Sequence, residues 1–120
     1  MPYEAADPPV IALLAEHCRR RGLYMILGCD ANAHHYQWGS RDVNKRGELV
    51  FNFITDYDLH ICNREIEPTF RTKDRESVID ITLANRRGDF VRDWRVNMDY
   101  SFSDHSVISF SLDLVGSKEL

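Results

Sequence analysis

The sequence predicts an α/β fold, in which helices and strands alternate at first and strands then follow one another. Three observations predict it: a helical segment that leads into a short apolar strand, a second such pair, and a series of alternating strands in the second half. The chain has 120 residues, of which 43% are hydrophobic. That length corresponds to one domain, and this apolar content is sufficient for a hydrophobic core.

The first helix is predicted to begin after Asp7, because an acidic N-cap followed by prolines is typical of a helix start. Gly22 is suited to follow the last turn. Arginines at residues 19–21 complement the helix dipole as a solvated helix end, and contact with a phosphate backbone is the alternative. The residues that recur at helical spacing are Val10, Leu13, Leu14, His17 and Cys18.

Residues 23–27 are predicted to form a short buried strand. The polar and aperiodic residues 30–46 then form a long loop, and loops of this length in a compact domain are usually functional or disordered. A second helix is expected to open at residues 46–48 and to lead to a short strand over residues 59–62. The apolar face of this helix comprises Leu49, Val50, Phe53, Ile54 and Tyr57.

Three strands are predicted in the second half: residues 77–83, residues 91–98, and a final strand after His105. Successive side chains of a strand point to opposite faces, so Asp80 and the apolar residues beside it face opposite ways. A turn at residues 86–88 separates the first two strands. The apolar faces comprise Ile79, Ile81 and Leu83, then Trp94, Val96 and Met98, then Ile108, Phe110, Leu112 and Leu114.

The composition of the chain limits the classes of function and the cellular compartments that are expected for it. The formal net charge of −4 counts against a pure nucleic-acid binder, but not against a metal-dependent nuclease whose acids gather at its site. Three cysteines without C-x-x-C spacing argue against a disulfide framework or a structural zinc site. Residues 1–4 lack signal-peptide character and no membrane span is present, so we expect an intracellular chain, in cytoplasm or nucleus.

Three aspartates stand out because apolar strand residues flank them: Asp30, Asp80 and Asp104. An ionised carboxylate in such surroundings is costly unless it is paired, hydrogen-bonded or bound to a metal. A single buried aspartate is usually structural. Three of them, with Asn32 and His105 close by in the sequence, indicate a functional site.

The chemistry that these residue types favour is hydrolysis of a phosphoester. We expect Asp30 to activate water and Asn32 to hold a phosphate oxygen. His105 stabilises the transition state, and Asp80 is the carboxylate that orients it. Asp104 is a candidate for contact with a divalent metal or for substrate positioning.

Three motifs then carry a resemblance to a known family. Residues 28–32 (Gly-Cys-Asp-Ala-Asn) resemble the G-x-D-x-N segment of the endonuclease/exonuclease/phosphatase superfamily. Residues 77–82 resemble its S-x-I-D-x-T strand, and residues 103–105 its S-D-H signature. The likeness is greatest to the apurinic-endonuclease-like domain of non-LTR retrotransposon polyproteins, in which Trp-Gly-Ser, Asn-Lys-Arg-Gly-Glu and Pro-Thr-Phe segments like those of this chain recur.

This resemblance implies a four-layer α/β/β/α sandwich, in which residues 1–114 correspond to the C-terminal half and residues 115–120 to a tail. The sheet is then mixed, largely antiparallel and covered by helices on one face. The family's first half supplies an Asn and a metal-binding Glu that nothing here matches, so the chain is expected to be truncated relative to the family. An uncovered apolar sheet face predicts association with that half or with itself.

The resemblance also suggests ligands. It implies Mg²⁺ or Mn²⁺ as cofactor and DNA as substrate, with no membrane partner. His34 and His35 either contact DNA or shape their loop, and a zinc site with Cys29 lacks a fourth ligand. Arg71 and Lys73 belong to a basic loop that either approaches the duplex or is simply solvated. Trp38 and Trp94 are expected to anchor the core or the loops.

The leading interpretation is therefore a metal-dependent DNA-nicking endonuclease domain of retrotransposon origin, whose activity as an isolated chain is in question. A phosphatase or phosphodiesterase of the same superfamily that acts on a small substrate is the first alternative. A catalytically inert remnant that serves as an association module is the second.

Overall fold

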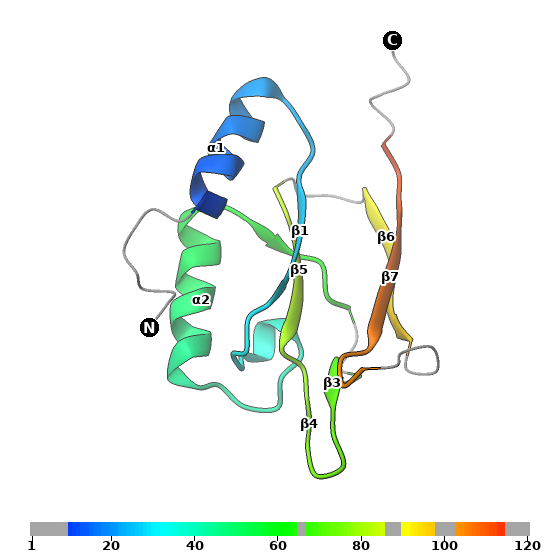
Figure 1. Ribbon diagram of the computed structural model, residues 1–120. Helices are drawn as coiled ribbons and strands as arrows, with labels where there is room; N and C mark the ends of the chain where they lie inside the picture. The colour runs from blue at the N-terminus through cyan, green and yellow to red at the C-terminus, as the bar shows by residue number, and fades with distance from the viewer. Residues whose placement is uncertain (1–9, 65–66, 86–89, 98–102, 115–120) are drawn as a thin grey trace.

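The computed structural model describes residues 10–64, 67–85, 90–97 and 103–114. Both helices lie on one side of a central sheet that contains β1 and β5, and a two-stranded unit of β6 and β7 lies on its other side (Figure 1). The predicted α/β class is thereby confirmed. The expected helix start at residues 7–9, the turn at residues 86–88, Met98 and the tail at residues 115–120 lie outside the described residues.

Helix α1 spans Val10–Arg21, and Gly22 follows it with a φ of 68°, as a residue past a helix end often does. The predicted apolar face is wrong except at Cys18. Ala12, Ala15 and Cys18 are the buried residues, whereas Val10, Leu13 and Leu14 are exposed. The helix packs through its small side chains, which project little from its surface, so the larger apolar residues lie toward solvent.

Helix α2 spans Lys45–Asp56 and begins one residue before the predicted start. Its N-cap is Asn44, whose side-chain oxygen accepts a hydrogen bond of 2.8 Å from the backbone N–H of Gly47. The predicted apolar face is confirmed at Val50 and Ile54, which are buried, but Leu49 and Tyr57 at its margins are exposed.

The central sheet has the order β1-β5-β2, and both of its pairings are antiparallel. Strand β1 is Ile26–Asp30, three residues later than predicted, and β2 is only His60–Ile61. Asn85 explains the later start of β1, because its side chain accepts from the N–H of Met25 and donates to the carbonyl of Leu23. The expected mixed sheet is not found: every described pairing is antiparallel.

The predicted strand over residues 77–83 is in fact two strands. Strand β4, Glu76–Ser77, pairs with β3, Phe70–Arg71, in a hairpin. Strand β5, Asp80–Ala84, pairs instead with β1 and β2. The chain thus changes partners within one apolar run, a change that alternation along the sequence does not reveal.

Strand β6, Val91–Asn97, pairs with β7, Val107–Leu112. The register shifts between Arg92 and Arg95, where Asp93 has a φ of 58°. Such a bulge breaks strict alternation, and so Val91 and Trp94 are both buried although three positions separate them.

Two apolar clusters hold these layers together. One lies between the helices and the central sheet and contains Trp38, Ile54, Ile81 and Leu83. The other lies between β5 and β6 and contains Trp94. The predicted core role of Trp38 and Trp94 is thereby confirmed. Neither α1 nor α2 has the length or the apolar composition that a membrane-crossing helix needs, and they are the only α-helices in the described residues.

Candidate active site

The site begins with two aspartates that the central sheet places opposite each other. Asp30 ends β1 and Asp80 begins β5, and the antiparallel register pairs them. The next pair along is hydrogen-bonded, since the N–H of Ala31 donates to the carbonyl of Ile79 over 2.9 Å. Bonded and non-bonded pairs alternate in an antiparallel ladder, so Asp30 and Asp80 form a non-bonded pair, in which side chains approach most closely.

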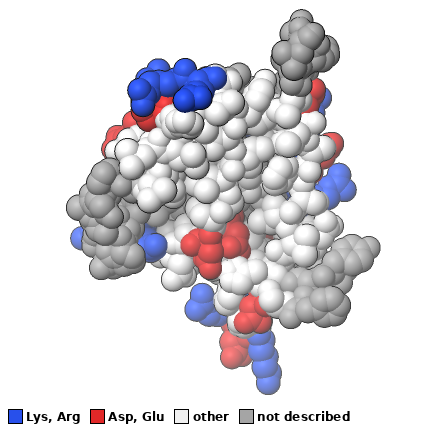
Figure 2. Space-filling view, turned by 45° about the horizontal axis from the view of Figure 1, so that its top comes forward, with Lys and Arg blue, Asp and Glu red and all other residues white. Residues whose placement is uncertain are grey.

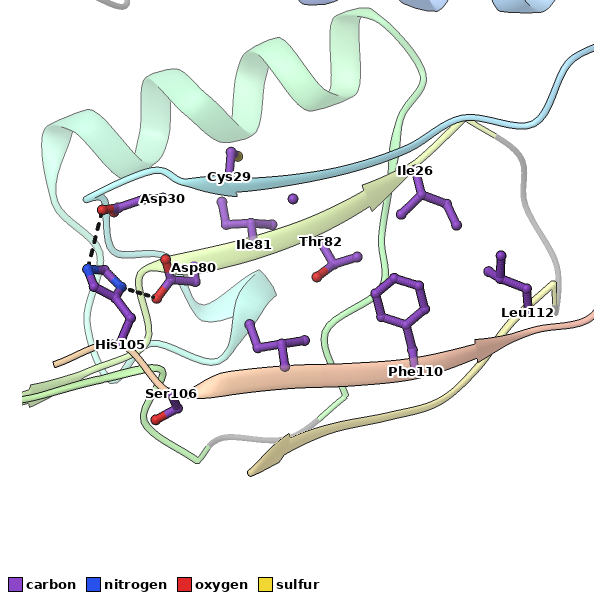
Figure 3. Close-up of a pocket in the computed structure, with 12 residues that line it drawn as sticks. Ile26, Cys29, Asp30, Asp80, Ile81, Thr82, His105, Ser106, Phe110 and Leu112 are labelled. Atoms are coloured by element: carbon purple, nitrogen blue, oxygen red, sulfur yellow. Dashed lines mark hydrogen bonds and ion pairs between the residues drawn. The ribbon is translucent and has the colours of Figure 1, made fainter. Parts of the chain in front are cut away.

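His105 completes this group from the segment that leads into β7, outside the central sheet. It precedes β7 and forms an isolated bridge with Phe70 of β3. Its Nδ1 lies 2.9 Å from Oδ2 of Asp80, and its Nε2 lies 3.6 Å from Oδ2 of Asp30 (Figure 3). The structure therefore brings together three of the five predicted catalytic residues, and we call Asp30, Asp80 and His105 the trio.

The contact with Asp80 defines how the imidazole is used. An ionised carboxylate only accepts hydrogen bonds. Nδ1 of His105 is therefore assigned the proton and donates the hydrogen bond to Oδ2 of Asp80. The Asp80 side chain is only 17% exposed, compared with 52% for Asp30. The half-buried carboxylate of Asp80 is thus placed to orient the ring, and the accessible carboxylate of Asp30 faces solvent.

The same carboxylates raise the pKa of His105. The largest cause is the hydrogen bond to Asp80, and the negative charges of Asp80, Asp30 and Asp104 add to it, while partial burial opposes it. The folded chain therefore holds the proton that charges the His105 ring more tightly than the unfolded chain does. The resulting contribution to stability is complete below the ordinary pKa of 6.5 and is lost as the pH rises through the raised pKa.

Replacing Asp80 with asparagine is expected to lower the pKa of His105 toward its ordinary value, because the main cause of the shift is removed. NMR titration of the His105 ring signals in metal-free buffer measures this pKa. The matched control is Asp42→Asn, which removes the carboxylate 2.7 Å from another imidazole, that of His34. An unchanged His105 pKa in Asp80→Asn would contradict the assigned cause.

Asn32 turns the chain away from the end of β1. Its φ of 48° is left-handed, a region that asparagine tolerates better than most residues. Its N–H donates to Oδ1 of Asp30 over 3.1 Å, so this backbone bond helps to fix the Asp30 carboxylate. The Asn32 side chain is exposed, and its contact with phosphate stays a prediction.

Asp104 does not join the trio. Among the described residues, Asp30, Asp80 and His105 form a cluster that could hold a metal ion. Their potential ligand atoms lie within 4.8 Å of one another, and Asp104 is not part of this cluster. Asp104 is exposed, and its backbone carbonyl accepts a bond of 2.7 Å from the N–H of Arg71. Its charge acts on His105 from outside the group, and its metal contact stays a prediction.

A groove of about 800 Å³ extends from the trio between the central sheet and β7. One end of it is polar and carries the trio. The other end is apolar, where Ile26 of β1 faces Phe110 and Leu112 of β7 (Figure 3). The last two side chains belong to the predicted apolar face of β7 and are exposed, so this end of the groove is open to solvent.

The structure gives His34 and His35 loop-shaping contacts. Nδ1 of His34 lies 2.7 Å from Oδ1 of Asp42. His35 Nδ1 accepts a hydrogen bond from the N–H of Gln37, and its ring stacks on Phe51 at a centroid distance of 4.5 Å. These contacts are those that the loop-shaping alternative requires, and contact with DNA stays a prediction for both residues.

Arg71 and Lys73 lie in the β3–β4 hairpin, which projects from the rest of the chain (Figure 1). Strand β3 also lies next to the trio, because Phe70 forms the isolated bridge with His105. Nε of Arg71 lies 3.3 Å from Oε2 of Glu76 across the hairpin, so part of its charge is compensated, while Lys73 is exposed. Figure 2 shows a compact acidic group in the middle of a largely uncharged face, with acidic and basic side chains mixed below it. DNA contact by these two residues stays a prediction.

The anchors of the loop after β1 were not identified from the sequence. Asn44 accepts from the N–H of His34 as well as capping α2, and Nε of Arg46 donates to the carbonyl of Ala31 over 2.8 Å. Both bonds tie the segment that follows Asp30 to the start of α2. An asparagine just before a helical run is a capping signal, which would have identified Asn44.

Cys29 lies next to Asp30 but takes no part in the trio. It lies on the side of β1 that faces α2 (Figure 3), where it packs against the apolar cluster beneath the helices. Burial is the main cause that raises the pKa of its thiol, and the charges of Asp80 and Asp30 add to it. Its thiol therefore stays protonated near neutral pH, and the three cysteines of the chain are free.

A histidine held between two strand-end aspartates on an α/β scaffold is the arrangement expected of a nuclease-like domain. Comparisons with known proteins then assign the family. The sequence matches the family described as endonuclease-reverse transcriptase over residues 3–109. The chain therefore belongs to this family, within the endonuclease/exonuclease/phosphatase superfamily, and the predicted resemblance is confirmed.

Two relatives agree with this assignment. The chain is 33% identical over 103 residues to the retrovirus-related Pol polyprotein from type-1 retrotransposable element R1 of Bradysia coprophila. That match covers 78% of this chain and 10% of the polyprotein. The solved endonuclease domain of TRAS1, a telomere-specific non-LTR retrotransposon, has a TM-score of 0.73 at 30% identity, with 88% of this chain and 52% of that one covered. The chain thus spans about half of one relative and about a tenth of the other.

Proposed function

We propose that this chain forms one wall of a divalent-metal-dependent endonuclease site that nicks DNA. The observation that carries the proposal is the His105 ring, which lies between the carboxylates of Asp30 and Asp80. Hydrolysis of a phosphodiester needs a group that takes a proton from water and a group that stabilises negative charge on phosphate. The trio supplies a carboxylate for the first task and an imidazole for the second.

Each member of the trio has a distinct role in this proposal. The accessible Asp30 accepts the proton of the attacking water. In its doubly protonated form, which the raised pKa favours, His105 keeps its Nδ1–H bonded to Asp80 and donates the proton on Nε2 to the phosphate oxygen that gains charge. Asn32, exposed beside Asp30, donates its side-chain amide to a second phosphate oxygen, and Asp104 assists in positioning the substrate.

The donor set fits a hard divalent cation. Mg²⁺ is usually held by one or two carboxylates together with water and substrate phosphate, and the trio offers the carboxylates of Asp30 and Asp80 within 4.8 Å of each other. When bound, Mg²⁺ or Mn²⁺ neutralises charge on the phosphate. His105 is committed to its hydrogen bond with Asp80 and is the least suited of the three to ligate this cation.

The proposal includes a partner for the open end of the groove. The chain covers 52% of the TRAS1 endonuclease domain, and Phe110 and Leu112 of β7 are exposed in the groove. We propose that the other half of the family domain packs on this apolar face, which would complete the four-layer sandwich and bring a further metal ligand. Self-association through the same face is the competing arrangement.

We expect the chain, mixed with the preceding half of a family domain, to nick supercoiled plasmid in Mg²⁺ and to lose this activity in EDTA. Replacing Asp30 with alanine should reduce nicking by about 10²- to 10⁴-fold, the usual contribution of a general base. Gel conversion of supercoiled to open-circular plasmid measures the rate.

The control is Asp56→Ala, which removes one acidic side chain at the end of α2, outside the groove. Nicking that persists in Asp30→Ala would refute the proposed role of Asp30. Turnover of a generic phosphomonoester without nicking would favour the small-substrate alternative. Neither activity, together with a stable dimer, would favour the inert association module.

A further inference from the structure

The backbone of Asp80 is held on both sides of its Cα by side chains rather than by a neighbouring strand. Its N–H donates to Oγ1 of Thr69 over 3.0 Å. Its carbonyl accepts from Nδ2 of Asn63 over 3.1 Å. Because Asp30 and Asp80 form a non-bonded pair, these groups point away from β1, toward the segment that follows β2.

Thr69 is completely buried and accepts a second amide, since the N–H of Ile79 donates to the same Oγ1 over 3.0 Å. Its carbonyl accepts from the N–H of Ser106 over 2.8 Å. One residue therefore contacts the start of the strand that carries Asp80 and the residue that follows His105. It fixes the two halves of the Asp80–His105 pair relative to each other.

Asn63 extends β2 with its side chain. Strand β2 ends at Ile61, but Oδ1 of Asn63 accepts from the N–H of Thr82 over 2.9 Å while its Nδ2 binds the carbonyl of Asp80. The same Nδ2 lies 3.4 Å from the carbonyl of Trp38. Asn63 thus joins the start of β5 to the loop after Asp30.

We propose that Asn63 and Thr69 are positioning residues that clamp the backbone of Asp80, so that its carboxylate meets Nδ1 of His105. Neither side chain belongs to the trio, and both act through Asp80. The inference rests on the proposed function for its catalytic meaning, but the clamp itself is a structural statement. Displacement of a catalytic group by about 1 Å can cost 10²-fold in rate, so such a clamp is sufficient to govern activity.

The test is the tautomer of neutral His105, read from long-range ¹H–¹⁵N NMR correlations of its ring above its pKa. In the wild-type chain we expect the proton on Nδ1, where Asp80 accepts it. In Thr69→Val and in Asn63→Ala the proton should move largely to Nε2, because the carboxylate is no longer held against Nδ1. Thr69→Ser keeps the hydroxyl and should restore the Nδ1 tautomer.

Thr72→Val is the matched control. Oγ1 of Thr72 also accepts two backbone amides, those of Asp74 and Arg75, but in the turn of the β3–β4 hairpin. The Thr72→Val variant should therefore leave the tautomer of His105 unchanged. The amide signals of β6 and β7 report whether each variant is folded. If Thr69→Val does not fold, Asn63→Ala provides the test of the clamp.

An Nδ1 tautomer that persists in a folded Thr69→Val or Asn63→Ala chain would overturn the clamp, and so would loss of that tautomer in Thr72→Val. This readout requires no catalysis, so a wild-type complex with the other half of a family domain that fails to nick DNA would refute the proposed function and leave the clamp to be judged on the tautomer alone. In an active complex, the clamp variants should lose about 10-fold or more in kcat with little change in KM, because substrate contacts are untouched.

Discussion

Replacing Gly47 with alanine is expected to lower the free energy of unfolding by about 3 kcal/mol or more, the upper range for overpacking. Gly47 lies in the first turn of α2, where a Cβ would overlap the backbone carbonyl of His34. A backbone carbonyl cannot rotate away as a side chain can. Urea denaturation followed by circular dichroism measures the change.

The sign of this prediction is informative, because alanine in place of glycine normally stabilises a helix by about 1 kcal/mol. Gly28→Ala is the control: a Cβ there has no neighbour within 4 Å, so its stability should remain within about 0.5 kcal/mol of wild type or rise slightly. A stable Gly47→Ala chain would show that the contact between α2 and the loop after β1 is looser than the structure has it.

The contact at Gly47 illustrates what the sequence could and could not predict. Helix α2 was predictable because its apolar residues recur at the helical period. The close approach of His34 to Gly47 was not, because it depends on the path of a loop that carries no periodic signal. Local patterns encode elements, whereas contacts between a loop and a helix arise only when the chain is folded.

The same distinction applies to the sheets. Alternation predicted a strand around Asp80, but it could not show that pairing changes between Ser77 and Asp80, where one partner is β3 and the next is β1. In α1 the helical spacing of the larger apolar residues selected Leu13 and Leu14 rather than Ala12 and Ala15 as the buried face. Side-chain size alone indicates burial poorly when a helix packs closely through small residues.

The candidate site was predicted more completely than the fold around it. Asp30 and Asp80 were identified because a charged side chain beside apolar strand residues is costly and requires a reason, and His105 was identified because it lies next to another such aspartate, Asp104, in the sequence. The structure supplies that reason by placing the three in one group. Asn63 was not identified because neutral side chains that bond to backbone are common in loops. Thr69 belongs to the Pro-Thr-Phe segment that carries part of the family resemblance, but that segment does not reveal the bond from Thr69 to the backbone of Asp80.

Replacing Trp38 with alanine is expected to cost about 3–5 kcal/mol of unfolding free energy, the range for removal of a large buried aromatic side chain. Trp38 is 1% exposed, and its Nε1 donates to the carbonyl of Ala33 over 3.1 Å. Trp38→Phe should cost less, because it keeps most of the apolar contact and leaves only that carbonyl without its donor. Thermal and urea denaturation measure both changes.

The consequence for the site separates Trp38 from an ordinary core residue. Its carbonyl lies near Nδ2 of Asn63, and it anchors the loop that follows Asp30. Trp94→Ala is the comparison, because Trp94 is also buried but packs between β5 and β6. Hydrogen exchange at the amides of Ser40 and Asn44, which bond to carbonyls in this loop, should accelerate relative to β6 only in Trp38→Ala. Equal acceleration in both variants would mean that the loop opens only when the whole domain unfolds, and that Trp38 does not hold the site by itself.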